Sequence, residues 1–328
     1  EATLAGSVAV RSAHGYLPAY ETNAMRIAGW YTVIYTAIFV AWTGAMVRYF
    51  KSLFYIQKGI FAIILTCVLE ALFTWLDHQD WNANGNRRDS LFLSSLVFYT
   101  LKYVLSWRLM LLAALGAGVV FEDLDLKTSV VFFIVSSLFM IQSCTWRLIM
   151  SYRYSHALES TLLLLVTFPG ILIYTGMFGW SFTLLSSLVT RVTEQKQEEL
   201  AGIFGKVKVI LIVGFFLSTI NASVQVLDIA KTLFSWDHAW FAVDGSPQLS
   251  FMAVLIAMMV VWQPTESSWK YGYQVQTNVA EDEEDADVNH IQLDASKPKA
   301  EKASMVAPEA IGAPEKEMPE GEDGENLL

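Results

Sequence analysis

Three charged side chains, Glu70, Lys102 and Arg108, lie within apolar stretches of the sequence. A charge in the hydrocarbon core of a bilayer is costly unless it faces the interior of a helix bundle or a partner. Such a set could form an internal ion pair, or it could line a polar cavity for an anionic headgroup, a cargo lipid or a conducted ion. A helix rises about 1.5 Å per residue, which puts a Glu70–Lys102 contact within reach, whereas Arg108 points to a different helix face from Lys102.

Other residues that could do chemistry are sparse. Cys67 and Cys144 lie inside apolar runs, which indicates buried thiols rather than a disulfide framework or a zinc site. The histidines of the membrane region fall in separate loops, and no P-loop, HExxH or GxSxG pattern occurs. We therefore predict a non-enzymatic protein with no catalytic residue, metal or cofactor, apart from a phospholipid that the bundle could bind.

The elements that must position these charges are membrane helices. The chain is 54% hydrophobic and 16% charged, against about 25% charged in an average soluble domain. A span needs about 20 apolar residues. Seven stretches between charges fit that length, with Glu70, Lys102 and Arg108 as the charges inside them: Ile27–Val47, Gly59–Leu76, Ser90–Phe121, Thr128–Trp146, Ser160–Thr190, Val209–Leu227 and Gly245–Thr265.

The fold class predicted is an all-α membrane protein, a seven-transmembrane helix bundle with a disordered acidic C-terminal tail. We place a luminal or extracellular segment at 1–28, the bundle at 29–270 and the cytoplasmic tail at 271–328. The tail carries 15 acidic residues and 4 lysines, whereas residues 1–270 carry 17 acidic and 18 basic residues. The net charge of −10 therefore belongs to the tail, and the absence of a basic stripe argues against nucleic-acid binding.

The orientation follows from the loops. With the N-terminus luminal or extracellular, nine Lys or Arg residues lie on the cytoplasmic side and six near the spans on the other side. The positive-inside rule favours that arrangement.

The fifth stretch contains Pro169 and Gly170. Proline removes a backbone donor and kinks a helix, which neighbouring helices can compensate in a membrane. We expect one long fifth helix kinked here, with a straight helix that has Pro169 near its outer end as the alternative.

The tail is too polar to fold by itself. It ends with Asp323 followed by Leu327 and Leu328, which fits the acidic dileucine pattern that sorting adaptors bind. The alternative is a solvated tail that only keeps the cytoplasmic side soluble.

Two well-known classes of seven-helix protein do not fit the sequence: the retinal-binding proteins and the G-protein-coupled receptors of the rhodopsin class. The last stretch, Gly245–Thr265, has no lysine for a retinal Schiff base. The third stretch closes with Val120–Asp123 rather than an Asp/Glu-Arg-Tyr motif, and the Asn-Pro-x-x-Tyr motif is absent from the seventh.

Four pieces, in order and spacing, resemble the GOST family, the Golgi-dynamics-domain seven-transmembrane proteins also called lung seven-transmembrane receptor-like and related to Wntless. They are Leu53–Lys58 leading into Leu69–Phe73, Leu101–Met110 leading into Leu115–Gly118, Phe168–Pro169 with Phe178–Phe182, and Trp236–Asp244 with Val261–Thr265. The chain departs from the family at Gly179 and Tyr174, and only 28 residues precede the first span, where the family carries a luminal β-sandwich domain. We expect 1–28 to be a remnant that follows such a domain.

The resemblance implies a lipid-filled cavity that opens sideways to the bilayer, with Glu70, Lys102 and Arg108 as its polar lining. It also implies work in Golgi and endosomal trafficking, or at the cell surface. The lead hypothesis is a cargo receptor or chaperone whose partners are the bilayer, a phospholipid, sorting adaptors and a luminal protein. The alternatives are a cation channel or receptor, and a structural subunit of a larger assembly.

Overall fold

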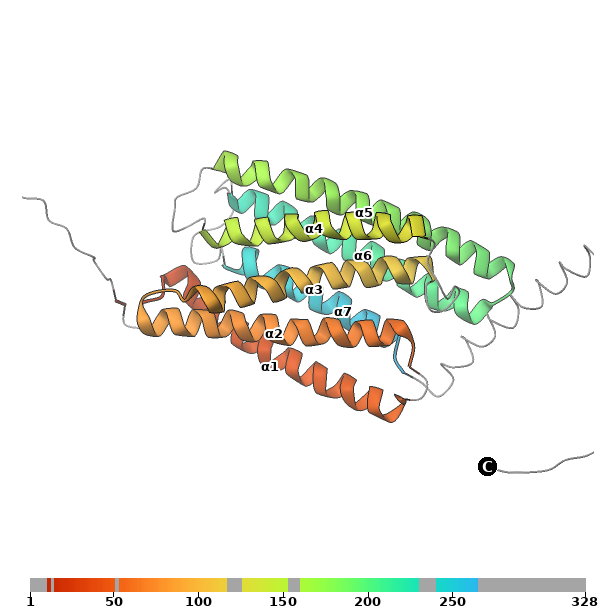
Figure 1. Ribbon diagram of the computed structural model, residues 1–328, viewed down its shortest axis with the longest axis horizontal. Coiled ribbons are helices and arrows are strands. Elements are labelled where there is room, and N and C mark those ends of the chain that lie inside the picture. Colours follow the sequence, from red (N-terminus) through yellow and green to blue (C-terminus); the bar gives the residue numbers. More distant parts are fainter. Residues whose placement is uncertain are drawn as a thin grey trace, which may run out of the picture. The chain divides into compact units, whose positions relative to one another are not determined.

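The computed structural model describes residues 11–12, 15–50, 53–116, 126–152, 160–229 and 240–264. The predicted tail lies outside the described residues, and so do Asp323, Leu327 and Leu328. Helices form nearly all the regular structure in the described part (Figure 1): α1 Ala19–Arg48, α2 Tyr55–Asn84, α3 Asp89–Leu115, α4 Leu126–Tyr152, α5 Ser160–Glu194, α6 Glu198–Ile229, the π-helical turn η2 Phe241–Gly245 and α7 Ser246–Val261.

Helices α1 to α6 are each long and apolar enough to cross a membrane. Helix α7 is a shorter apolar helix of 16 residues, and η2 extends it at its start. The predicted all-helical, seven-helix membrane fold is confirmed. Helix α1 begins at Ala19, so part of the segment predicted to precede the bundle is already helical.

Glycines close two of the helices. Gly85 ends α2 with φ 77°, and Gly116 ends α3 with φ 76°, a left-handed conformation that favours glycine. We call the two ends of the bundle the Gly85 end and the Gly116 end. Helices α1, α3, α5 and α7 start at the Gly85 end, and α2, α4 and α6 finish there.

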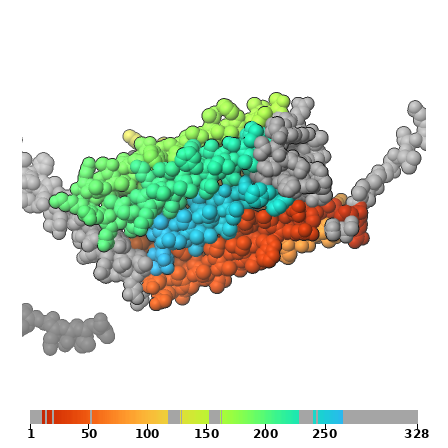
Figure 2. All heavy atoms as spheres, turned by 180° about the vertical axis from the view of Figure 1, so that it is seen from behind, coloured from red at the N-terminus to blue at the C-terminus, as the bar shows by residue number. Residues whose placement is uncertain are grey.

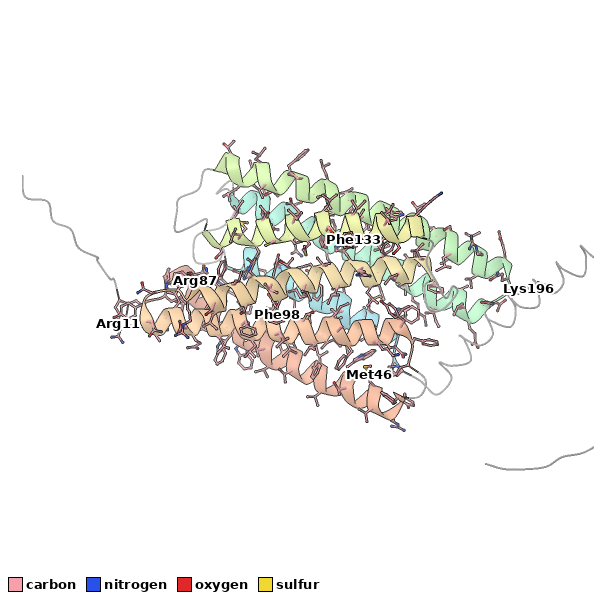
Figure 3. The ribbon with its side chains drawn as sticks, viewed as in Figure 1. Arg11, Met46, Arg87, Phe98, Phe133 and Lys196 are labelled. Atoms are coloured by element: carbon pink, nitrogen blue, oxygen red, sulfur yellow. The ribbon has the colours of Figure 1, made fainter. Side chains whose placement is uncertain are left out.

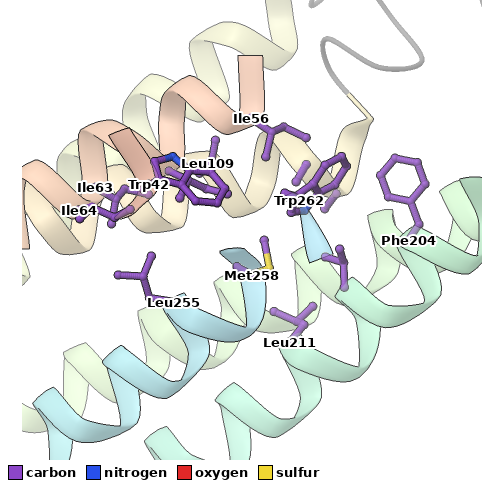
Figure 4. Close-up of a cluster of buried hydrophobic side chains, with 14 of the residues drawn as sticks. Trp42, Ile56, Ile63, Ile64, Leu109, Phe204, Leu211, Leu255, Met258 and Trp262 are labelled. Atoms are coloured by element: carbon purple, nitrogen blue, oxygen red, sulfur yellow. The ribbon is translucent and has the colours of Figure 1, made fainter. Parts of the chain in front are cut away.

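Helix α7 lies between α1 and α6 on the face shown in Figure 2. It is tied to its neighbours at both ends. The hydroxyl of Tyr31 on α1 donates to the carbonyl of Gly245 at 2.9 Å, and Nε2 of Gln57 on α2 donates to the carbonyl of Trp262 at 3.2 Å. The largest buried cluster surrounds this helix and includes Trp42, Leu109, Phe204, Leu255 and Met258 (Figure 4).

Large apolar side chains are exposed along the outer faces of the helices, among them Val40 on α1, Phe133 on α4, Leu165 and Phe168 on α5 and Phe216 on α6. A protein in water rarely exposes so much contiguous apolar surface. The faces suit contact with lipid tails.

Helix α5 runs through Pro169 and Gly170 without a break. Gln142 on α4 supplies a donor beside the proline, because its Nε2 donates to the carbonyl of Val166 at 2.9 Å. A Cβ at Gly170 would lie 2.8 Å from that same nitrogen. The glycine therefore leaves room for the amide, and α4 and α5 can approach closely at this point.

Candidate functional site

A buried charged cluster joins three helices at one level of the bundle. Nζ of Lys102 on α3 lies 3.1 Å from Oε2 of Glu70 on α2. It also donates to Oε1 of Gln248 on α7 at 3.0 Å. Gln248 in turn donates from Nε2 to Oε1 and Oε2 of Glu70, at 2.9 and 3.1 Å. The predicted Glu70–Lys102 contact is present, and Gln248 completes it.

Aromatic rings surround the ammonium group of Lys102. Its Nζ lies 4.8 Å from the ring centre of Tyr103, 5.1 Å from that of Phe251 and 5.4 Å from that of Tyr99. Ring faces attract a cation, more strongly when water is excluded. Lys102 is 0% and Glu70 2% exposed, so the described residues around the pair shield it from solvent and lipid.

Arg108 does not join this cluster. Its side chain is exposed on α3, whereas Lys102 is buried. Six residues along an α-helix turn the side chain by about 240°, which places the two cations on different faces. Of the three charged residues, only Glu70 and Lys102 therefore come together, and the neutral amide of Gln248 is their third partner.

A large cavity lies between α2 and the five helices α3 to α7. Its volume is about 790 Å³, within the range of about 300–1,000 Å³ typical of small-molecule sites. Among the described residues that line it, none is Asp, Glu, Lys, Arg or His. Glu70, Lys102 and Arg108, which we expect to form the polar lining of such a cavity, are not among these residues.

The polarity of the side chains that line the cavity changes from one end to the other. Towards the Gly85 end its lining includes uncharged polar side chains from α4, α6 and α7: Gln142, Ser143, Ser218, Asn221, Gln225 and Ser250. Towards the Gly116 end the lining is mostly aliphatic: Ile60, Ile63, Leu109, Met110, Leu211 and Met258. The cavity thus offers a hydrogen-bonding zone and an apolar zone.

A second, small cavity of about 60 Å³ lies next to the large one. Five of the described residues line both cavities and form the boundary between them: Tyr99, Tyr103, Trp146, Gln225 and Pro247. The lining of the small cavity is partly polar and includes Glu70, Gln248 and His78. A water molecule needs at least about 10–15 Å³ of cavity volume, so the small cavity has room for a few water molecules.

Two ion pairs lie beside the small cavity at the Gly85 end. Nη1 of Arg147 on α4 lies 3.0 Å from Oδ1 of Asp244 in η2, and Nε2 of His78 lies 3.1 Å from Oε2 of Glu21. Burial raises the pKa of the Asp244 carboxyl, although the Arg147 guanidinium opposes the shift. The pair links α4 to the start of α7.

A further ion pair fixes the turn between α2 and α3. Nε of Arg87 donates to Oδ2 of the fully buried Asp77 at 2.9 Å, and Nη2 contacts the same oxygen. The guanidinium also lies 4.0 Å from the ring centre of Phe92. Figure 3 shows Arg87 at the Gly85 end and Lys196 at the α5–α6 turn at the opposite end.

The described residues give little support for metal binding or for a disulfide. No group of three or more His, Cys, Asp or Glu side chains among them is arranged to hold a metal ion. Cys67 and Cys144 are free thiols, Cys67 being buried and Cys144 half-buried. The arrangement can hold an apolar or amphiphilic molecule in the large cavity and a few waters in the small one.

The fold and this interior define a multi-pass α-helical membrane protein. The sequence matches the family described as "GOST, seven transmembrane domain" over residues 23–269. The chain belongs to the GOST family.

The relatives are remote. The chain is 24% identical to Membrane protein PTM1 of Saccharomyces cerevisiae (strain YJM789) over 272 residues, which cover 79% of this chain and 51% of that protein. It is 21% identical to Transmembrane protein 87A of Xenopus tropicalis, over 85% of this chain and 51% of that protein. It is also 21% identical to Transmembrane protein 87B of Mus musculus, over 84% and 49% of the two chains. The chain thus spans about half the length of these curated relatives.

Proposed function

We propose that this protein is a non-enzymatic trafficking factor of the Golgi–endosome–surface circuit, which uses the cavity between α2 and α3 to α7 to hold a lipid or the apolar part of a cargo. The observation that carries the proposal is the cavity of about 790 Å³ with its apolar and hydrogen-bonding zones. A cavity of this size inside a membrane protein weakens packing, because its lining atoms lose contacts. An occupant would restore those contacts.

The orientation proposed places the Gly85 end in the lumen or outside the cell and the Gly116 end in the cytoplasm. Exposed cations at the Gly116 end support it, for example Arg48, Lys58, Arg108 and Lys127. The charges described at the Gly85 end are mostly paired, as Arg87 and Arg147 are. The acidic tail and its terminal leucines would then face cytoplasmic sorting adaptors.

The substitution Ser218→Trp tests the cavity, because Ser218 lines it. The matched control is Gly176→Trp, since a side chain at Gly176 meets open space outside the cavity. Both variants are expressed in cells that lack the endogenous protein. Native mass spectrometry of the purified proteins measures bound lipid, and surface biotinylation measures delivery of cell-surface proteins.

We expect Ser218→Trp to lose both the bound lipid and rescue of surface delivery, while Gly176→Trp retains both. Rescue by a folded Ser218→Trp protein would overturn a role for the cavity in trafficking. Cation flux through liposomes that contain the wild-type protein, abolished by Glu70→Gln, would instead support the channel alternative. A monodisperse elution profile in mild detergent shows that each variant is folded.

A further inference from the structure

We infer that the large cavity selects a lipid whose head carries no net charge and discriminates against anionic lipids. The inference rests on the proposed function and names the class of molecule that the cavity takes. Its basis is the combination of an uncharged lining with two nearby ion pairs that are already neutralised.

The lining offers no counter-charge to an ionised head. Where described, it contains amides and hydroxyls as its polar groups, gathered towards the Gly85 end. A net charge buried without a partner is far more costly than an uncharged polar group that finds a hydrogen bond. Hydroxyl, amide and ester groups match this lining.

The buried ammonium of Lys102 is not available to an anionic head. It is held by Glu70 and Gln248, at 3.1 and 3.0 Å. The rings of Tyr99, Tyr103 and Phe251 surround it, and all three rings also line the cavity. The ligand therefore meets aromatic rings where it would otherwise meet a cation.

The guanidinium of Arg147 is likewise neutralised. It pairs with Asp244 at 3.0 Å, and Arg147 lines the small cavity but not the large one. Cation and anion occur together in both pairs, so neither pair contributes a net charge that would favour a charged lipid. The hydrogen-bonding zone instead orients a neutral head towards the Gly85 end, with its tails among the aliphatic residues.

The test uses the full chain reconstituted in phosphatidylcholine bilayers. Each bilayer contains an equal, small mole fraction of a diacylglycerol, a phosphatidylcholine or a phosphatidylserine with the same diazirine-labelled tail. After irradiation, mass spectrometry compares labelling of the cavity-lining residues Ser218, Ala222 and Gln225 on α6, assigned residue by residue, with labelling of the exposed α1 face around Val33 and Val40. The α1 face corrects for the concentration of each lipid in the bilayer.

We expect both neutral lipids to label the cavity, and phosphatidylserine to label it at least about tenfold less, relative to α1. The variant Gln142→Lys adds an unpaired cation and should raise phosphatidylserine labelling, whereas Gln142→Met should not. Ser143→Lys and Ser143→Met provide a second pair of variants at the same zone. The two neutral lipids distinguish a diacylglycerol-like head from a zwitterionic one.

Equal cavity labelling by phosphatidylserine in the wild-type protein would overturn the charge selection but leave the lipid-holding function standing. Absence of cavity labelling by all three lipids, with α1 labelled normally, would overturn the inference and the proposed function together.

Discussion

Gln248 donates hydrogen bonds to both carboxylate oxygens of Glu70, at 2.9 and 3.1 Å. The same amide accepts a hydrogen bond from Lys102 at 3.0 Å, so one neutral side chain bridges both members of a buried ion pair. The bridge connects α7 to α2 and α3. It satisfies polar groups that the membrane interior would otherwise leave without partners.

The substitution Gln248→Leu should lower the free energy of unfolding by about 1 kcal/mol, because interhelical hydrogen bonds in membrane proteins have modest net values. Chemical denaturation in mild detergent, followed by tryptophan fluorescence, measures the change. The control is Leu249→Ala at the neighbouring position, where half of the side chain is exposed. A Gln248→Leu protein as stable as the wild type would show that the bridge contributes nothing to stability.

The Glu70–Lys102 pair should behave as a unit. Lys102→Met or Glu70→Gln alone should cost about 3 kcal/mol or more, because each leaves the other partner as an uncompensated buried charge. The double variant should cost clearly less than the sum of the two single variants. The same denaturation assay gives the coupling energy, and Arg108→Met, at an exposed position, serves as a near-neutral control. Strict additivity would contradict the pairing.

The α2–α3 turn contains two adjacent arginines that we expect to differ sharply. Arg87→Met leaves the fully buried Asp77 without its cation and should destabilise by about 3 kcal/mol. Arg88 is 61% exposed and pairs with Asp80, so Arg88→Met should cost less than about 0.5 kcal/mol. Thermal unfolding in detergent compares the two variants. Equal losses would mean that the buried contact has no special role.

The terminal leucines provide a prediction about location. Replacing Leu327 and Leu328 with alanine should move the protein from internal compartments to the cell surface, because an acidic dileucine signal depends on both leucines. Surface biotinylation and microscopy measure the distribution. Leu293→Ala, elsewhere in the tail, is the matched control. An unchanged distribution would leave the tail with a solubilising role only.

The sequence predicted the helices and one contact well, for physical reasons. Bilayer thickness fixes the length of each apolar span, and the cost of a membrane charge makes Glu70 and Lys102 expected partners. The helical period also correctly predicted that Arg108 and Lys102 lie on different faces of α3.

Gln248 and the cavity lining escaped that reasoning. An amide near the start of a span adds little to hydropathy, and serines such as Ser218 and Ser250 occur on many membrane helices. Whether a residue faces lipid or a cavity depends on how helices far apart in sequence pack. Gly170 illustrates the point, because its role depends on Gln142 approaching from another helix.

The bridge from Gln248 to Glu70 and Lys102 also has a consequence for divergence within the family. Each of the three side chains is acceptable at its depth because the other two are present. Loss of Glu70 alone would leave the Lys102 ammonium buried without a counter-charge. Loss of Gln248 would leave polar atoms of the other two side chains without a hydrogen-bond partner. Substitutions at these positions should therefore be correlated across descendants, so that lineages keep the trio whole or replace its charged members together by apolar residues.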